Sequence, residues 1–200
     1  MAPMPPGTAA RPARLRAAWR EAHEPVEGVS RSARRIACAI PLTVLPSSLW
    51  RLPVALRPGI GLGERAYVIG LSVLCEVLAL TAFGLIARWG EVFPGWVPYL
   101  RGRRVPVSAA VIPAGLGATA LTLLWTVLTF LTEIMGRTIT GERLPADFPT
   151  RAGGWQALSL YVCYTPLLLW GPLLGSLTVA YVRRRRRSPR KGRHPLRPSG

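Results

Sequence analysis

The chain has 200 residues, of which half are hydrophobic, and a formal net charge of +17. A soluble domain of this length would repeat its apolar residues with a period of about two or about 3.6, but here they form long continuous runs. The arginines flank these runs without a nucleic-acid recognition motif, so we expect no nucleic-acid partner and attribute the charge to membrane topology.

Four apolar segments are long enough to cross the hydrocarbon of a bilayer, which takes about 20 helical residues. They cover residues 36–57, 66–87, 105–132 and 155–182. The sequence therefore predicts an all-α fold, a transmembrane bundle of four helices. Prolines inside the first and fourth spans predict helix kinks; they are Pro41, Pro46, Pro53, Pro166 and Pro172.

Two basic tails, residues 1–35 and 183–200, enclose the membrane domain at 36–182. Their richness in Pro and Arg predicts disorder. In the first tail, Leu15, Trp19 and Ala22 recur at helical spacing, so a short interfacial helix before Pro25 is the alternative. The first tail lacks the charged, apolar and small-residue order of a cleavable signal peptide, so we expect the first span to act as an uncleaved signal anchor.

The basic residues indicate the orientation of the bundle. Seven lie in the first tail, four in the second connection and nine in the last tail, against two at the first connection, with Arg57 at the end of the first span included, and three in the third. Because basic residues concentrate in the cytoplasm, both termini are expected there. Arg outnumbers Lys by 25 to one, which is typical of a GC-rich bacterial gene, so we expect the bacterial plasma membrane. The run at 183–187 predicts a stop-transfer anchor or, alternatively, attraction of anionic lipids.

The second connection, residues 88–104, combines prolines with aromatic residues. The prolines oppose a regular helix, and the aromatic rings favour the headgroup level of the membrane. We therefore expect this connection to lie in the interface. Its interfacial aromatics are Trp89, Phe93, Trp96 and Tyr99.

This stretch has the pattern RWGExxPxWxPxxxGRxVP over residues 88–106. It resembles a segment of an uncharacterised family of actinobacterial four-span integral membrane proteins, in which the Trp-Gly-Glu turn, the Pro-x-Trp-x-Pro step and the Gly-Arg-x-Val-Pro entry occur together. The resemblance covers only these residues and implies a four-span fold. It implies no known activity.

Residues suited to catalysis or metal binding are few and scattered. His23 and His194 lie in the tails, and Asp147 is the one aspartate of the chain. The three cysteines lie singly in apolar runs, without a CxxC pair. This pattern predicts no catalytic, metal or cofactor site, and we expect a protein that is not an enzyme.

Arg51 and Glu76 are the charged residues that lie inside the predicted spans rather than at their ends. A charge in hydrocarbon costs about 2.5 to 3.5 kcal/mol on insertion scales, which favours a partner or a wet cavity. The two residues lie at comparable depths in successive spans, so they form a candidate intramembrane ion pair. The alternative is that Arg51 extends to the outer interface while Glu76 stays protonated beside neighbouring hydroxyl groups.

Small residues recur at intervals of four in the third and fourth spans, at Ala110, Ala114 and Ala118 and at Gly171 and Gly175. Such faces let helix backbones approach closely. The pattern predicts packing within the bundle or, alternatively, a homo-oligomer. For function we expect a non-enzymatic accessory or structural membrane component. The alternative is a small proton-coupled transporter or channel subunit that uses Glu76.

Overall fold

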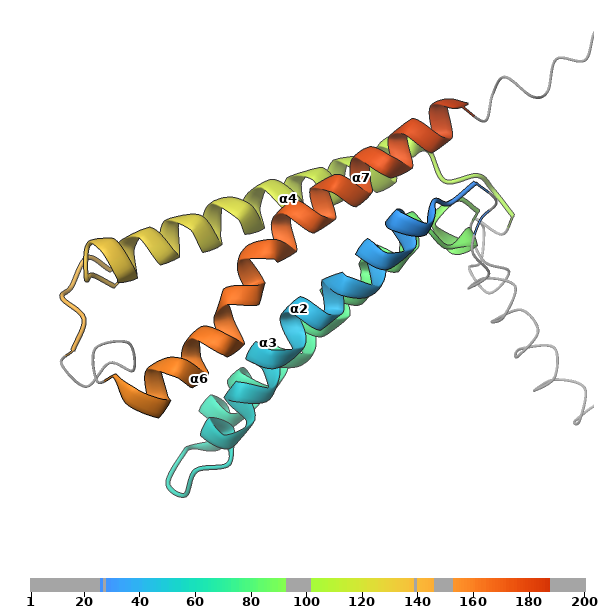
Figure 1. Ribbon diagram of the computed structural model, residues 1–200. Helices are drawn as coiled ribbons and strands as arrows, with labels where there is room; N and C mark the ends of the chain where they lie inside the picture. Colours follow the sequence, from blue (N-terminus) through green and yellow to red (C-terminus); the bar gives the residue numbers. More distant parts are fainter. Residues whose placement is uncertain (1–25, 27, 93–101, 139, 146–152, 188–200) are drawn as a thin grey trace, which may run out of the picture.

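The computed structural model describes residues 26, 28–92, 102–138, 140–145 and 153–187 (Figure 1). Throughout these residues the secondary structure is helical and contains no strand beyond two isolated bridges. Four helical segments are long and apolar enough to span a membrane. The predicted all-α bundle of four helices is therefore confirmed.

The first two segments form a helical hairpin. Helix α2 covers Arg31–Ala55 and helix α3 covers Leu62–Thr81, which continues into the 3-10 turn η1 at Ala82–Leu85. A second 3-10 turn, η2, follows at Arg88–Gly90. Helix α2 begins at a capped turn, because the Ser30 hydroxyl accepts a hydrogen bond of 3.1 Å from the Ala33 amide.

The third and fourth segments are less regular. Helix α4 covers Val107–Thr129 and ends in the π-helical turn η3 at Phe130–Ile134. The fourth segment consists of α6 at Gly154–Tyr164, the 3-10 turn η4 at Thr165–Leu169 and α7 at Trp170–Arg187.

The helices extend into the expected tails at both ends of the bundle, and the boundaries of the membrane domain stay a prediction. Helix α2 already begins at Arg31, and α7 continues through Arg187, so residues 31–35 and 183–187 are helical. Arginine is a good helix former, and a helix continues beyond the hydrocarbon where its sequence permits. The predicted disorder of residues 1–25 and 188–200 lies outside the described residues.

The prolines interrupt the helices unequally. Pro41, Pro46 and Pro53 all lie inside the continuous helix α2. Pro166 lies in η4, where the fourth segment changes direction between α6 and α7 (Figure 1). Pro172 lies in the first turn of α7, where a missing amide hydrogen costs little.

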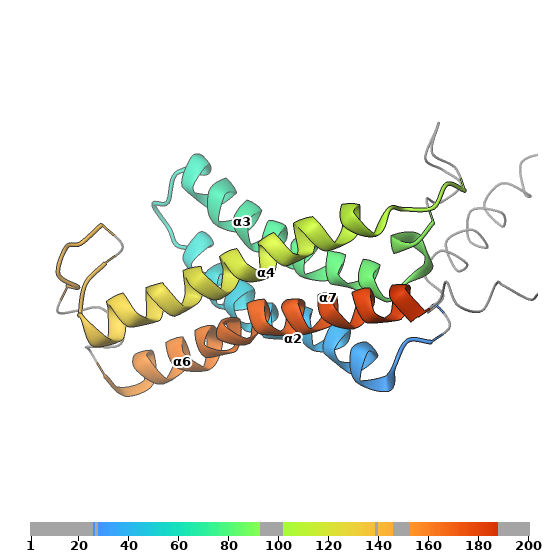
Figure 2. The same ribbon diagram turned by 90° about the horizontal axis from the view of Figure 1, so that it is seen from above.

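The helices pack in the order α3, α2, α7, α4. Helix α2 contacts both α3 and α7, whereas α4 packs mainly on α7. The α2–α3 hairpin and α4 converge where α2 begins and α7 ends, and they spread apart toward the other end (Figures 1 and 2). We call the converging end, at Arg31 and Arg187, the basic end.

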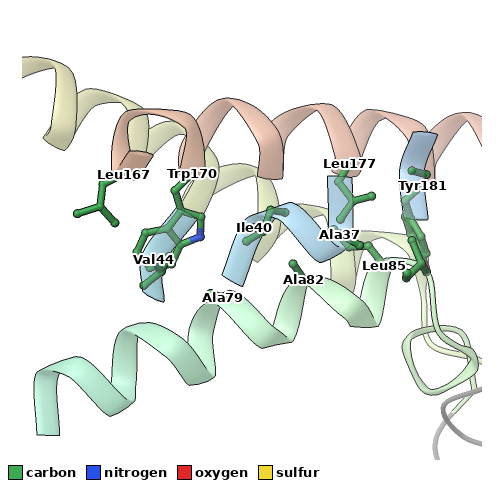
Figure 3. Close-up of a cluster of buried hydrophobic side chains, with 12 residues drawn as sticks. Ala37, Ile40, Val44, Ala79, Ala82, Leu85, Leu167, Trp170, Leu177 and Tyr181 are labelled. Atoms are coloured by element: carbon green, nitrogen blue, oxygen red, sulfur yellow. The ribbon is translucent and has the colours of Figure 1, made fainter. Parts of the chain in front are cut away.

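The buried core follows this packing order (Figure 3). Helix α2 contributes Ile40 and Val44, and the fourth segment contributes Leu167, Leu177 and Tyr181, all at most 2% exposed. Alanines of α2, α3 and η1 fill the space between these larger side chains. They are Ala33, Ala37, Ala79 and Ala82.

Small residues bring α4 and α7 into direct backbone contact. A Cβ added at Gly171 would lie 2.8 Å from the Ala118 carbonyl oxygen and 2.7 Å from the Thr122 amide nitrogen. One turn later, a Cβ added at Gly175 would lie 3.7 Å from the Cβ of Ala118, which is an ordinary contact. The small-residue faces thus pack within the chain, as the first interpretation predicted. The homo-oligomer stays a prediction.

Candidate functional site

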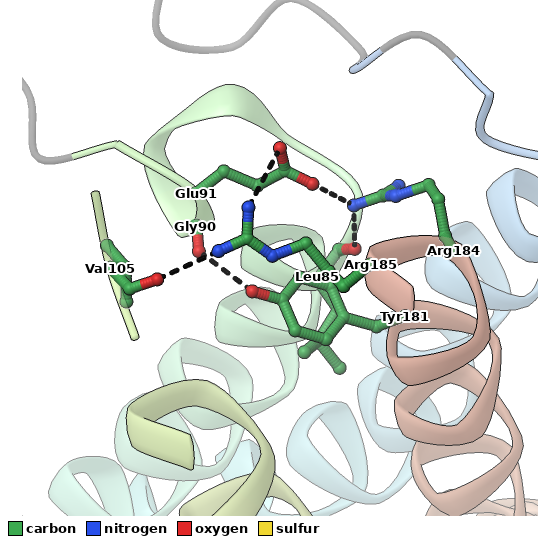
Figure 4. Close-up of polar contacts among 7 residues, drawn as sticks. All are labelled: Leu85, Gly90, Glu91, Val105, Tyr181, Arg184 and Arg185. Atoms are coloured by element: carbon green, nitrogen blue, oxygen red, sulfur yellow. Dashed lines mark hydrogen bonds and ion pairs between the residues drawn. The ribbon is translucent and has the colours of Figure 1, made fainter. Parts of the chain in front are cut away.

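The best-formed polar site lies at the basic end and consists of Glu91, Tyr181, Arg184 and Arg185 (Figure 4). We call it the Glu91 cluster. Arg184 Nη2 donates to Glu91 Oε1 at 2.7 Å, and Arg185 Nη1 lies 3.7 Å from Glu91 Oε2. The side chains of the three charged residues are only 12 to 19% exposed. One carboxylate therefore bridges two adjacent guanidinium groups that water reaches poorly.

The same arginines also donate to backbone carbonyl groups of other elements. Arg184 Nη2 lies 3.2 Å from the oxygen of Leu85, and Arg185 Nη2 lies 2.9 Å from that of Val105. Leu85 ends the second segment and Val105 precedes α4. The C-terminal turn of α7 consequently joins both ends of the connection between α3 and α4.

Tyr181 completes the cluster from one turn earlier on α7. Its hydroxyl donates to the carbonyl oxygen of Gly90 at 3.4 Å. The guanidinium carbons of Arg184 and Arg185 lie 5.5 and 5.9 Å from the centroid of its ring, within the range of cation–π attraction. The ring thus separates the two charges from the apolar core beneath them.

The connection has a local fold that presents Glu91. The amide of Val105 donates to the carbonyl oxygen of Glu91 at 2.8 Å, and Val92 forms a bridge with Arg104. Gly90 packs directly on the backbone of Gly84, where a Cβ would clash with the Gly84 carbonyl group. The Trp-Gly-Glu turn therefore needs its glycine for close packing, which places the carboxylate against α7.

This cluster was not predicted from the sequence. The signal was present, because Glu91 is the one acidic residue in a connection that holds four arginines. Its partners follow it by more than 90 residues, at the end of α7. They lie in a run of five arginines, which the sequence explained as a stop-transfer anchor or as a site of lipid attraction. Nothing in that run distinguishes Arg184 and Arg185 from the other three as partners of Glu91.

The predicted interfacial aromatics are described only at Trp89. The Trp89 ring is partly buried and packs against Gly84. A Cβ added at Gly84 would lie only 2.6 to 3.1 Å from three carbons of this ring. Phe93, Trp96 and Tyr99 lie outside the described residues. The interfacial placement of this connection stays a prediction.

Arg51 and Glu76 face different surroundings. Arg51, on α2, places its guanidinium carbon 5.6 Å from the centroid of the Tyr164 ring, and its Nη1 is buried without a hydrogen-bond partner. Glu76, on α3, is partly buried, and its Oε1 also has no partner. Within the described residues no ion pair or hydrogen bond joins the two side chains. Their pairing stays a prediction, since each retains an unused buried polar atom.

A third polar contact involves a residue that sequence analysis did not select. Glu133 lies in η3, just beyond the predicted third span, and its Oε2 accepts a hydrogen bond of 2.6 Å from the Tyr161 hydroxyl on α6. The two residues are exposed at the end opposite the Glu91 cluster. This bond joins the third and fourth segments where they have otherwise spread apart.

Within the described residues, no group of three or more His, Cys, Asp or Glu residues could hold a metal ion. The cysteines are all free and separate. The fold defines the class of the protein, because its four apolar helices are those of an integral, multi-pass membrane protein. Comparison of the chain with protein-family models, curated proteins and solved structures gave no match.

Proposed function

We propose that the protein is a non-enzymatic accessory or structural component of a bacterial plasma membrane. The observation that supports this role is the bonding of the Glu91 cluster, whose donors are used on the protein's own backbone. Arg184, Arg185 and Tyr181 donate to carbonyl groups at Leu85, Val105 and Gly90. Polar groups that are bonded within the chain in this way stabilise a bundle and have less capacity for a reacting substrate.

The orientation that we propose places the basic end in the cytoplasm. Reporter fusions after Gly102 and Ser188 should then report an interior location, and fusions after Gly63 and Gly141 an exterior one, because basic residues are retained in the cytoplasm. Paired phosphatase and fluorescent-protein reporters would measure both states. An interior signal after Gly141 would contradict the proposal, since it requires a different number of spans.

A second candidate function follows from Glu76. Its Oε1 is buried in a spanning helix without a hydrogen-bond partner, and intramembrane carboxylates of this kind often carry protons. We therefore keep a small proton-coupled transporter or channel subunit as the alternative. The partial resemblance of residues 88–106 to the actinobacterial four-span family supports the membrane role and distinguishes neither candidate.

Proton flux in vesicles separates the two functions. For an accessory protein, vesicles with the wild type and with Glu76→Gln should show the same rate of acidification as vesicles with the exposed control Glu64→Gln. A pH-sensitive dye inside the vesicles gives this rate. Flux in the wild type that disappears only in Glu76→Gln would establish the transporter instead.

A further inference from the structure

A pocket opens beside the Glu91 cluster, between the start of α2 and the end of α7. It has a volume of about 520 Å³, within the range of about 300 to 1,000 Å³ that is usual for small-molecule sites. Part of its wall is apolar and includes Val29, Leu85 and Leu177. Another part is basic and includes Arg183, Arg184 and Arg187. The pocket therefore suits a molecule with an anionic part and an apolar part.

The basic wall is held in place by the Glu91 cluster. Arg184 is fixed by its bonds to Glu91 and to the carbonyl group of Leu85. Arg183 and Arg187 are exposed, and no hydrogen bond or ion pair engages them within the described residues. Fixing the helix end in advance lowers the ordering cost of binding, while the two free guanidinium groups supply the charge.

The position of the pocket along the bundle indicates the kind of ligand. It lies where two spanning segments meet their charged ends, since α2 begins at Arg31 and α7 ends at Arg187. In a bundle that spans a bilayer, such charged helix ends are expected at the level of the phospholipid headgroups, where arginines bind phosphate through paired hydrogen bonds. The first turn of α2 adds amide groups and a positive helix end on the facing side. Basic pockets between spanning helices are suited to anionic headgroups.

We propose that this pocket binds the phosphate group of an anionic phospholipid, with Arg183 and Arg187 as its ligands and the apolar wall against the upper part of the acyl chains. The site goes beyond the accessory role and does not depend on it. Lipid binding in this pocket also differs from the general attraction of anionic lipids to a basic tail. It depends on where Arg183 and Arg187 lie, whereas the general attraction depends on how many arginines there are.

The test compares two variants that lose the same charge. The first is Arg183→Gln with Arg187→Gln, in the pocket, and the control is Arg35→Gln with Arg186→Gln, at the same end but outside it. Native mass spectrometry of the full chain with dioctanoyl phosphatidylglycerol should show binding at least about tenfold weaker for the first variant and less than about threefold weaker for the control. Equal weakening in both would overturn the site.

A steric pair tests the same pocket without changing charge. Ala180 lines the pocket and Val179 is exposed outside it, so Ala180→Phe should block the lipid while Val179→Phe should not. Circular dichroism verifies that both variants fold. If Ala180→Phe binds the lipid like the wild type, the ligand does not occupy this pocket.

Other probes distinguish the source of the phosphate. Dioctanoyl phosphatidylcholine and inorganic phosphate should each fail to compete with the phosphatidylglycerol, because neither combines a net negative charge with an apolar part. If inorganic phosphate competes and phosphatidylcholine does not, the pocket binds a free anion and the lipid assignment is overturned. If the wild type binds no lipid but the variant Glu21→Gln, Glu24→Gln, Glu27→Gln does, the pocket belongs to the chain's own first tail and the proposal fails.

Discussion

Replacing Gly171 by alanine should destabilise the protein by about 2 kcal/mol, because overpacking a close helix contact typically costs about 1 to 3 kcal/mol. The added Cβ would lie 2.8 Å from the Ala118 carbonyl oxygen and close to the Thr122 amide, both backbone atoms of α4. Backbone atoms cannot rotate aside, so α4 and α7 would have to separate. Unfolding in mixed detergent micelles, followed by tryptophan fluorescence, measures this loss.

Gly175→Ala is the matched control, one turn away on the same helix. Its Cβ would meet the Ala118 side chain at 3.7 Å, so we expect a change within about 0.5 kcal/mol. The two variants have the same chemistry and the same helix propensity. Equal stability of both would show that α4 and α7 do not approach as closely as the structure has them.

Glu91→Gln should cost about 2 kcal/mol of stability, because it removes the negative charge of a carboxylate that bridges two poorly hydrated guanidinium groups. The side chains of Glu91 and Arg184 are 17% and 12% exposed, so salt should screen the pair only weakly. Chemical unfolding at low and high salt would give similar losses. As for Gly171→Ala, unfolding is carried out in mixed detergent micelles and followed by tryptophan fluorescence.

The control for this variant is Glu64→Gln. Glu64 is exposed in the first turn of α3, and we expect its replacement to change stability by less than about 0.5 kcal/mol. Should Glu91→Gln behave like this control, the cluster is dispensable. A loss that high salt abolishes would instead assign the pair to the exposed surface.

The four helices could be predicted from the sequence because most residues of a helix that crosses a bilayer have to be apolar. Long apolar runs satisfy that condition, and they locate the segments to within a few residues. The helix ends could not be predicted from hydropathy. Arg31 and Arg187 continue their helices outside the apolar run, since backbone hydrogen bonding does not end where the hydrocarbon does.

The polar contacts depend on which helices are neighbours, and hydropathy carries no such information. Arg51 contacts Tyr164 because α2 packs against the fourth segment as well as against α3. Only a short connection separates α2 from α3, which favours their pairing, but nothing comparable in the sequence indicates that α7 lies between α2 and α4. The pairing of Glu91 with Arg184 follows from that same placement.

The packing order has a consequence for how the protein is assembled during synthesis. Helix α4 packs mainly on α7, which is synthesised after the other three segments, whereas α2 and α3 can pair as soon as both have emerged. We therefore expect the third segment to stay in the lipid without its main partner until α7 has been made. The bundle should close when α7 packs between α2 and α4, and Arg184 and Arg185 can then bond to the two ends of the connection between α3 and α4. The C-terminal turn of α7 should thus be the last part of the described bundle to take its place.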